Sequence, residues 1–171
     1  VVLFFFILTF FLIVTKFDIK EIQISHWGVM KSVGWIFNYG IILVSISTFF
    51  NVFSYIKNHN RIFKKNILYI LFGLVSFSLF LVGLFPVNIN PSIHNFSAFS
   101  YFFIYPLSIF LLSHLNRKNI IYKEWITHLI TSFLMFVIPM VFISMFNGMA
   151  ISEIIHTILV MFWNVRILIK N

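Results

Sequence analysis

The chain alternates between long apolar runs and short polar, charged interruptions. The apolar runs cover residues 1–15, 35–55, 67–85, 97–113, 126–146 and 151–169. Most of them approach the ~20 residues that a helix needs to cross about 30 Å of hydrocarbon. The pattern therefore predicts an all-α, polytopic membrane protein in which six transmembrane helices form one bundle.

Polar residues inside these runs recur at helical spacing, which gives several predicted helices a polar face. In the last run the face consists of Glu153, His156, Thr157, Val160 and Asn164. Within a bilayer such groups turn toward neighbouring helices, where each hydrogen bond is worth about 0.6 to 2 kcal/mol. We therefore expect these faces to point into the bundle and most of their Ser, Thr and Asn side chains to link helices.

Composition strengthens the membrane assignment. Of the 171 residues, 61% are hydrophobic and only 9% are charged, and the mean hydropathy is +1.03. A soluble domain of this size cannot bury so much apolar surface, so the apolar side chains face lipid. Six spans leave no room for a separate soluble domain, and residues 1–171 are expected to form a single transmembrane domain. The absence of Cys excludes disulfides, thiolate metal sites and cysteine nucleophiles.

The net charge of +8 reflects membrane topology rather than nucleic-acid binding, because the basic residues lie in short loops between apolar runs. Most Lys and Arg residues fall in residues 56–66, in residues 114–125 and near the C-terminal end, whereas residues 86–96 and 147–150 contain none. Basic loops remain in the cytoplasm. The sequence thus predicts a multi-pass protein of the cell membrane with both termini cytoplasmic and membrane lipids as its neighbours.

This topology predicts a specific labelling result. The chain contains no Cys, so a single introduced thiol has no background. A Cys at Asn90 should react with a membrane-impermeant thiol reagent in intact cells, because residues 86–96 are predicted to be extracytoplasmic. A Cys at Asn60 should react only after the membrane is permeabilised. The reverse labelling pattern would contradict the predicted orientation.

The first apolar run begins at Val1 without an initiator Met or a basic flank. It has no basic n-region and no small-x-small cleavage site before Lys16, which favours a span over a cleaved signal peptide. We therefore expect the sequence to be truncated at its N-terminus and to lack the cytoplasmic anchor of its first span.

The first outer loop, residues 16–34, mixes charged residues with large apolar ones. Such a mixture is typical of a segment that lies on the membrane surface or folds back over the mouth of the bundle. Trp27 and Trp35 are expected at the membrane–water interface, where Trp is enriched.

Histidine and glutamate gather on the predicted outer side. His26 lies in the first outer loop, His94 in the second, and Glu153 with His156 near the outer end of the last helix, where positions i and i+3 share a face. Catalytic zinc commonly takes three such ligands, but these spacings match no zinc motif such as His-Glu-x-x-His. A hydrogen-bonded or ligand-contacting cluster is therefore favoured. His94, Glu153 and His156 remain weak metal candidates, and no cofactor is expected.

The other histidines are interpreted as contacts to lipid headgroups. His59 and His114 lie in basic loops, and His128 lies just inside the predicted cytoplasmic end of the fifth helix. A bis-histidine haem would need two rings facing each other at one depth. His94 with His156 is the one plausible outer pair, and with no matching inner pair haem is not expected.

Several segments resemble a known family. They are residues 24–28 (ISHWG), 35–40 (WIFNYG), 82–86 (VGLFP) and 91–95 (PSIHN), together with Glu153. With them the chain resembles, over nearly its whole length, the bacterial and archaeal integral membrane family catalogued as domain of unknown function 998. It more distantly resembles eukaryotic six-span proteins of the Frag/DRAM/Sfk type. His26 stands where an apolar residue is expected in the family pattern. The resemblance implies a six-helix bundle without an established activity.

Two functions from different classes are consistent with these residues. The favoured one is binding of a lipid or small hydrophobic ligand in a polar cavity that faces the outer leaflet. The residues expected to line it are Asn38, His94, Tyr101, Glu153 and His156. The alternative is an intramembrane, metal-dependent lipid hydrolase that uses His94, Glu153 and His156, one of them as general base. A transporter is less favoured, because the sequence shows no internal repeat and no pair of broken helices.

Overall fold

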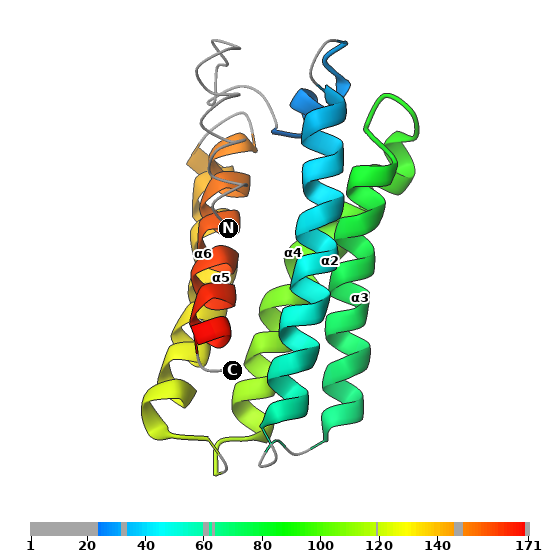
Figure 1. Ribbon diagram of the computed structural model, residues 1–171. Helices are drawn as coiled ribbons and strands as arrows, with labels where there is room; N and C mark the ends of the chain where they lie inside the picture. The colour runs from blue at the N-terminus through cyan, green and yellow to red at the C-terminus, as the bar shows by residue number, and fades with distance from the viewer. Residues whose placement is uncertain are drawn as a thin grey trace.

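The computed structural model describes residues 24–31, 34–59, 62, 64–118, 120–145 and 149–169. Its long helices are α2 (Gly34–Asn58), α3 (Lys65–Leu84), α4 (Pro91–Leu115), α5 (Tyr122–Met145) and α6 (Ala150–Ile169). A short 3₁₀ helix, η1 (Ile24–Val29), precedes them (Figure 1). The described part of the chain contains no strand.

The long helices confirm the predicted all-α membrane class. Each of the 5 is long and apolar enough to cross a membrane. They correspond to the second to sixth predicted spans, whereas the first predicted span, residues 1–15, lies outside the described residues. The protein is thus a multi-pass membrane protein, and five of its six predicted spans are seen as helices.

One predicted boundary is wrong. Residues 86–96 were expected to form a loop, yet α4 begins at Pro91. The side chain of Asn90 accepts a hydrogen bond from the backbone N–H of Ile93 at 3.1 Å, and Pro91 occupies the first helical turn, where its missing N–H costs nothing. His94 therefore lies in the first turns of a helix rather than in a loop.

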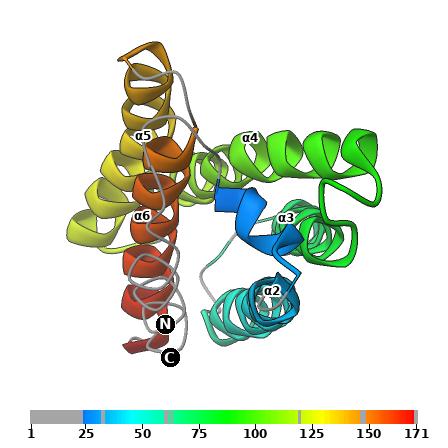
Figure 2. The ribbon, with the colours of Figure 1, turned by 90° about the horizontal axis from the view of Figure 1, so that it is seen from above.

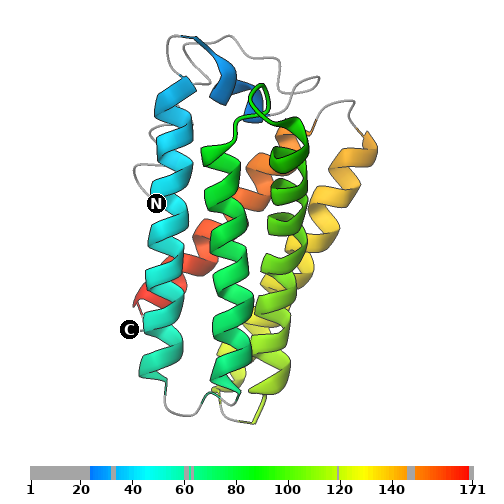
Figure 3. The same ribbon diagram turned by 90° about the vertical axis from the view of Figure 1, so that its right-hand side faces the viewer.

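The helices form a closed bundle. Each long helix packs against the next one in the chain, and α2 also contacts α6. Figure 2 looks onto one end of the bundle and shows η1 lying across it. Figure 3 shows that the connection between α3 and α4 lies at the same end. This end is called the η1 end below, and the other is called the opposite end.

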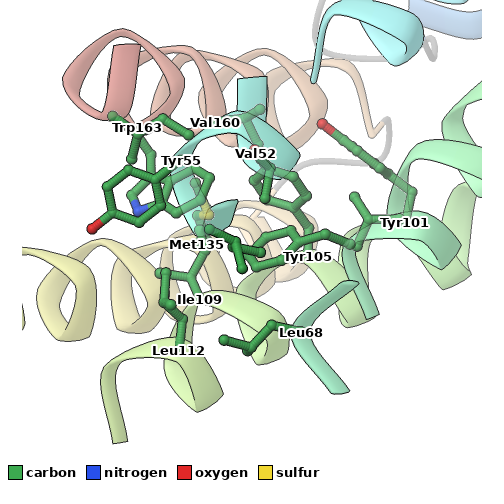
Figure 4. Close-up of a cluster of buried hydrophobic side chains, with 14 of the residues drawn as sticks. Val52, Tyr55, Leu68, Tyr101, Tyr105, Ile109, Leu112, Met135, Val160 and Trp163 are labelled. Atoms are coloured by element: carbon green, nitrogen blue, oxygen red, sulfur yellow. The ribbon is translucent and has the colours of Figure 1, made fainter. Parts of the chain in front are cut away.

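Aromatic and aliphatic side chains fill the centre of the bundle (Figure 4). Trp163 is fully buried and stacks on Phe72, with ring centroids 5.6 Å apart and planes inclined by 12°. Tyr105 meets the same indole edge to face at 5.9 Å. Such aromatic pairs add about 0.5 to 1.5 kcal/mol to the burial of their surfaces.

The polar faces point inward as predicted. His156, Val160 and Asn164 are buried, and Glu153 and Thr157 are half-buried. Short hydrogen bonds link neighbouring helices: Ser45 Oγ donates to Ser76 O at 2.7 Å, Ser132 Oγ to Pro106 O at 2.7 Å, and Asn164 Nδ2 to Tyr105 Oη at 2.7 Å. These side chains therefore link helices in a medium that offers no water as an alternative partner.

Candidate functional site

The η1 helix covers the end of the bundle and is tied to two long helices. The backbone N–H of Ile24 donates to Glu153 Oε2 of α6 at 2.6 Å. Asn38 Nδ2 of α2 donates to Gly28 O at 2.9 Å. The predicted surface segment thus folds back over the bundle mouth.

Trp27 anchors η1, and its position corrects the sequence prediction. It was expected at the membrane interface, yet its side chain is fully buried and meets Phe37 edge to face at 5.9 Å. Trp35, by contrast, is 61% exposed, as an interfacial residue is.

His94 is held in one orientation by the end of α3. Its Nδ1 lies 2.9 Å from Phe85 O, and because a carbonyl only accepts, Nδ1 is the donor. In the neutral ring Nε2 is then left as an acceptor. The ring is buried, and it lines a cavity together with Glu153.

Two adjoining polar cavities lie beneath η1. The inner cavity has a volume of about 80 Å³ and is lined by Ile24, Ser25, Phe37, Ile41, Leu79, Val82, His94, Ala98, Tyr101, Phe102, Glu153 and Thr157. The outer polar cavity has about 250 Å³ and is lined by Ser25, His94, Asn95, Ala98, Phe99, Phe102, Met149 and Glu153. Ser25, His94 and Glu153 line both cavities, and His94 and Glu153 are the ionisable side chains among these three.

An apolar groove lies beside the outer polar cavity, between α4 and α5. It has about 310 Å³ and is lined by Phe99, Phe102, Phe103, Met135, Phe136, Pro139, Met140, Ile143 and Met149. Phe99, Phe102 and Met149 line both spaces, so the two adjoin. Phe99, Phe103 and Met140 are each more than half exposed, so the groove opens on the lipid-facing surface.

The expected cavity residues do not all meet. His94, Tyr101 and Glu153 line the inner cavity. Asn38 holds η1 instead of lining either polar cavity. His156 lies behind the ring of Phe102, with the two ring centroids 4.6 Å apart.

The position of His156 follows from a proline in the neighbouring helix. Pro139 has no N–H, so the carbonyl of Met135, four residues earlier in α5, loses its helical donor. His156 Nδ1 lies 3.4 Å from that carbonyl and is its donor, while Nε2 is buried without a hydrogen-bond partner. One turn away in α6, Ser152 Oγ donates to Pro139 O at 3.0 Å. His156 thus stabilises the interrupted helix.

The weak metal hypothesis receives no support from this geometry. Among the described residues, no three His, Asp or Glu side chains lie close enough together to hold a metal ion. His94 and Glu153 share a cavity, but the aromatic side chain of Phe102 separates it from His156. The proposed ligand set of His94, Glu153 and His156 is therefore not assembled.

A family match covers nearly the whole chain. The sequence model described as "Protein of unknown function (DUF998)" matches residues 1–169. The chain belongs to this family. No curated protein and no solved structure matches it, so the more distant likeness to Frag/DRAM/Sfk-type proteins stays a prediction.

The segments that carry the DUF998 resemblance surround the polar cavities. Residues 82–86 end α3 and supply the carbonyl that orients His94, while residues 91–95 begin α4 and contain His94 itself. Residues 24–28 form most of η1. In this DUF998 protein the resembling segments are thus neighbours in space, although they are far apart in the sequence.

A second buried polar cluster, at the opposite end, was missed from the sequence. His128 was interpreted as a headgroup contact, yet it is only 2% exposed. Trp163 Nε1 donates to His128 Nδ1 at 2.9 Å, so the neutral ring carries its proton on Nε2, which lies 3.3 Å from Tyr55 Oη. The signal that was available is spacing, because positions 124, 128, 131 and 135 share one face of α5, and all four side chains are buried.

Proposed function

We propose that the protein binds a membrane lipid, with the headgroup in the outer polar cavity and an acyl chain along the apolar groove. The observation that supports this proposal is that the two spaces adjoin and share Phe99, Phe102 and Met149 in their linings. A space with polar groups beside an apolar one matches an amphiphile. A small, wholly hydrophobic ligand would leave the remaining acceptor positions of Glu153 and His94 facing apolar atoms, which is costly.

The dimensions support a ligand larger than water. The inner cavity, at about 80 Å³, has room for a few water molecules. The outer polar cavity and the apolar groove, at about 250 and 310 Å³, approach the range of roughly 300 to 1,000 Å³ that is typical of small-molecule sites. Both also adjoin the membrane-facing side of α4 and α5, from which a lipid enters without crossing water.

The basic loops support an assignment of the site to the outer leaflet. Residues 56–66 and 114–125 connect helices at the opposite end, so the positive-inside rule assigns the η1 end to the extracytoplasmic side. In this orientation the ligand is a lipid of the outer leaflet of the cell membrane.

Filling the site tests the proposal. Ala98 lines both polar cavities, so Ala98→Phe puts a phenyl ring into the space assigned to the headgroup. The matched control is Ile70→Phe, because Ile70 is 64% exposed on α3 and lines none of these cavities. Native mass spectrometry of detergent-purified protein should show bound lipid in the parent and in Ile70→Phe and its loss in Ala98→Phe. Folded Ala98→Phe protein that retains the same lipid as the parent would contradict the proposal.

A further inference from the structure

We propose that the headgroup bound in the outer polar cavity carries a primary ammonium group, which Glu153 and His94 receive. This inference rests on the proposed lipid-binding function and names the chemical class of its ligand. It follows from three properties of the cavity: the sign of its charge, the acceptor atoms of Glu153 and His94, and the apolar groove that adjoins it.

Charge is the first argument. Glu153 is the charged side chain that lines both polar cavities, and neither Lys nor Arg lines them among the described residues. The recorded partner of its carboxylate is the backbone N–H of Ile24, and no cation of the described residues forms an ion pair with it. A half-buried carboxylate at membrane depth without a cation is unfavourable, and a bound cation lowers that cost. A headgroup that is only anionic would increase it.

Hydrogen bonding is the second argument. A carboxylate accepts on two oxygens, and the Ile24 N–H occupies a single site on Oε2. The Nδ1–H of His94 is already engaged with Phe85 O, which leaves Nε2 of the neutral ring as an acceptor. Two acceptors that line the same cavity favour a ligand that carries donors. A primary ammonium has three N–H donors, whereas a trimethylammonium has none.

The adjoining groove is the third argument, because it identifies the source of the ammonium. A free amine has no group to place against Phe99, Phe102 and Met149, which line both the polar cavity and the groove. An aminolipid places its acyl chain in the groove, and this contact raises the local concentration of its headgroup near Glu153. We therefore assign the ammonium to a lipid and not to a soluble amine.

A headgroup series tests the inference with the full chain in detergent. Dioctanoyl lipids with ethanolamine, choline or glycerol headgroups are titrated against the protein by native mass spectrometry, and free ethanolamine is added as a competitor. The ethanolamine lipid should bind at least about tenfold more tightly than the other two, which is the range expected for charged hydrogen bonds. Free ethanolamine at the same concentration as the ethanolamine lipid should displace none of the bound lipid.

Glu153→Gln identifies the group responsible. The amide has the shape of the carboxylate and still accepts from the Ile24 N–H, so η1 stays anchored. Affinity for the ethanolamine lipid should fall about tenfold or more, to that of the glycerol lipid, while affinity for the glycerol lipid changes less than about twofold. Glu124→Gln is the matched control, because Glu124 is a buried Glu of α5 at the opposite end and should leave all three affinities unchanged.

The outcomes separate the two proposals. If none of the lipids binds the parent, or if Ala98→Phe binds them all as the parent does, the proposed function fails. If the lipids bind in a manner sensitive to Ala98→Phe but with equal affinities, only the ammonium inference is overturned. Equal affinities for the ethanolamine and choline lipids, both lowered in Glu153→Gln, would show that charge acts without N–H donation and would also overturn it. Displacement by free ethanolamine would exclude the lipid as the source.

Discussion

Trp163→Ala is expected to be the most damaging single substitution in the bundle. The indole is fully buried, stacks on Phe72, meets Tyr105 edge to face and donates to His128. Truncation leaves a large cavity where α3, α4, α5 and α6 meet and removes the donor to His128 Nδ1. Substitutions of this type cost about 3 to 5 kcal/mol, because the surrounding helices collapse only partly into the space. The free energy of unfolding, measured by titration with a denaturing detergent in bicelles, should fall by that amount.

The adjacent residue provides the control for this prediction. Phe162 has a side chain of similar size in the same helix, but it is 54% exposed on the lipid-facing side. Phe162→Ala should lower the free energy of unfolding by less than about 1 kcal/mol, because lipid chains replace the lost contacts. Equal losses in both variants would show that Trp163 is not packed as described.

Gly83→Leu is expected to separate α2 from α3 at the η1 end. A Cβ atom at Gly83 would lie 2.8 Å from the backbone O of Asn38 and 2.8 Å from Ile42 Cγ1, so a backbone must move to admit it. Overpacking of this kind costs about 1 to 3 kcal/mol, and the involvement of backbone places this case at the upper end. The expected loss of about 3 kcal/mol is measurable in the same unfolding titration.

Gly73→Leu is the matched control, because it makes the same chemical change in the same helix. A Cβ at Gly73 meets no atom within 4 Å. Both substitutions improve helix propensity to the same degree, so that contribution cancels in the comparison. Gly73→Leu should change stability by no more than about 0.5 kcal/mol. A destabilisation equal to that of Gly83→Leu would contradict the close approach of α2 and α3.

The membrane spans were predictable because lipid exposure requires long apolar runs, and hydropathy measures these directly. The start of α4 was missed for a related reason. Hydropathy indicates where a helix enters the hydrocarbon of the membrane. Asn90 and Pro91 indicate where the hydrogen bonding of α4 begins, and the helix begins before the apolar run does. The capping residues were present in the sequence and would have put His94 in a helix.

The partners of the polar residues were less predictable. The spacing of Glu153 and His156 puts them on one face of α6, but the ring of Phe102 from α4 separates His156 from the cavity. Trp27 is of a residue type that is enriched at the membrane interface, yet tertiary packing buries it against Phe37. Spacing along one helix identifies a face, and only the neighbouring helices determine what that face meets.

The proline in the wall of the groove affects how easily that wall deforms. Pro139 lines the groove, and the hydrogen bond that a residue with an N–H would make from this position to Met135 O is replaced by one from His156 of α6. Ser152 of α6 donates separately to Pro139 O. The gap that the proline leaves in the backbone ladder of α5 is thus filled by side chains of another helix. Sliding α6 along α5 would remove the donor of Met135 O, so the two helices are mechanically coupled at the wall of the groove.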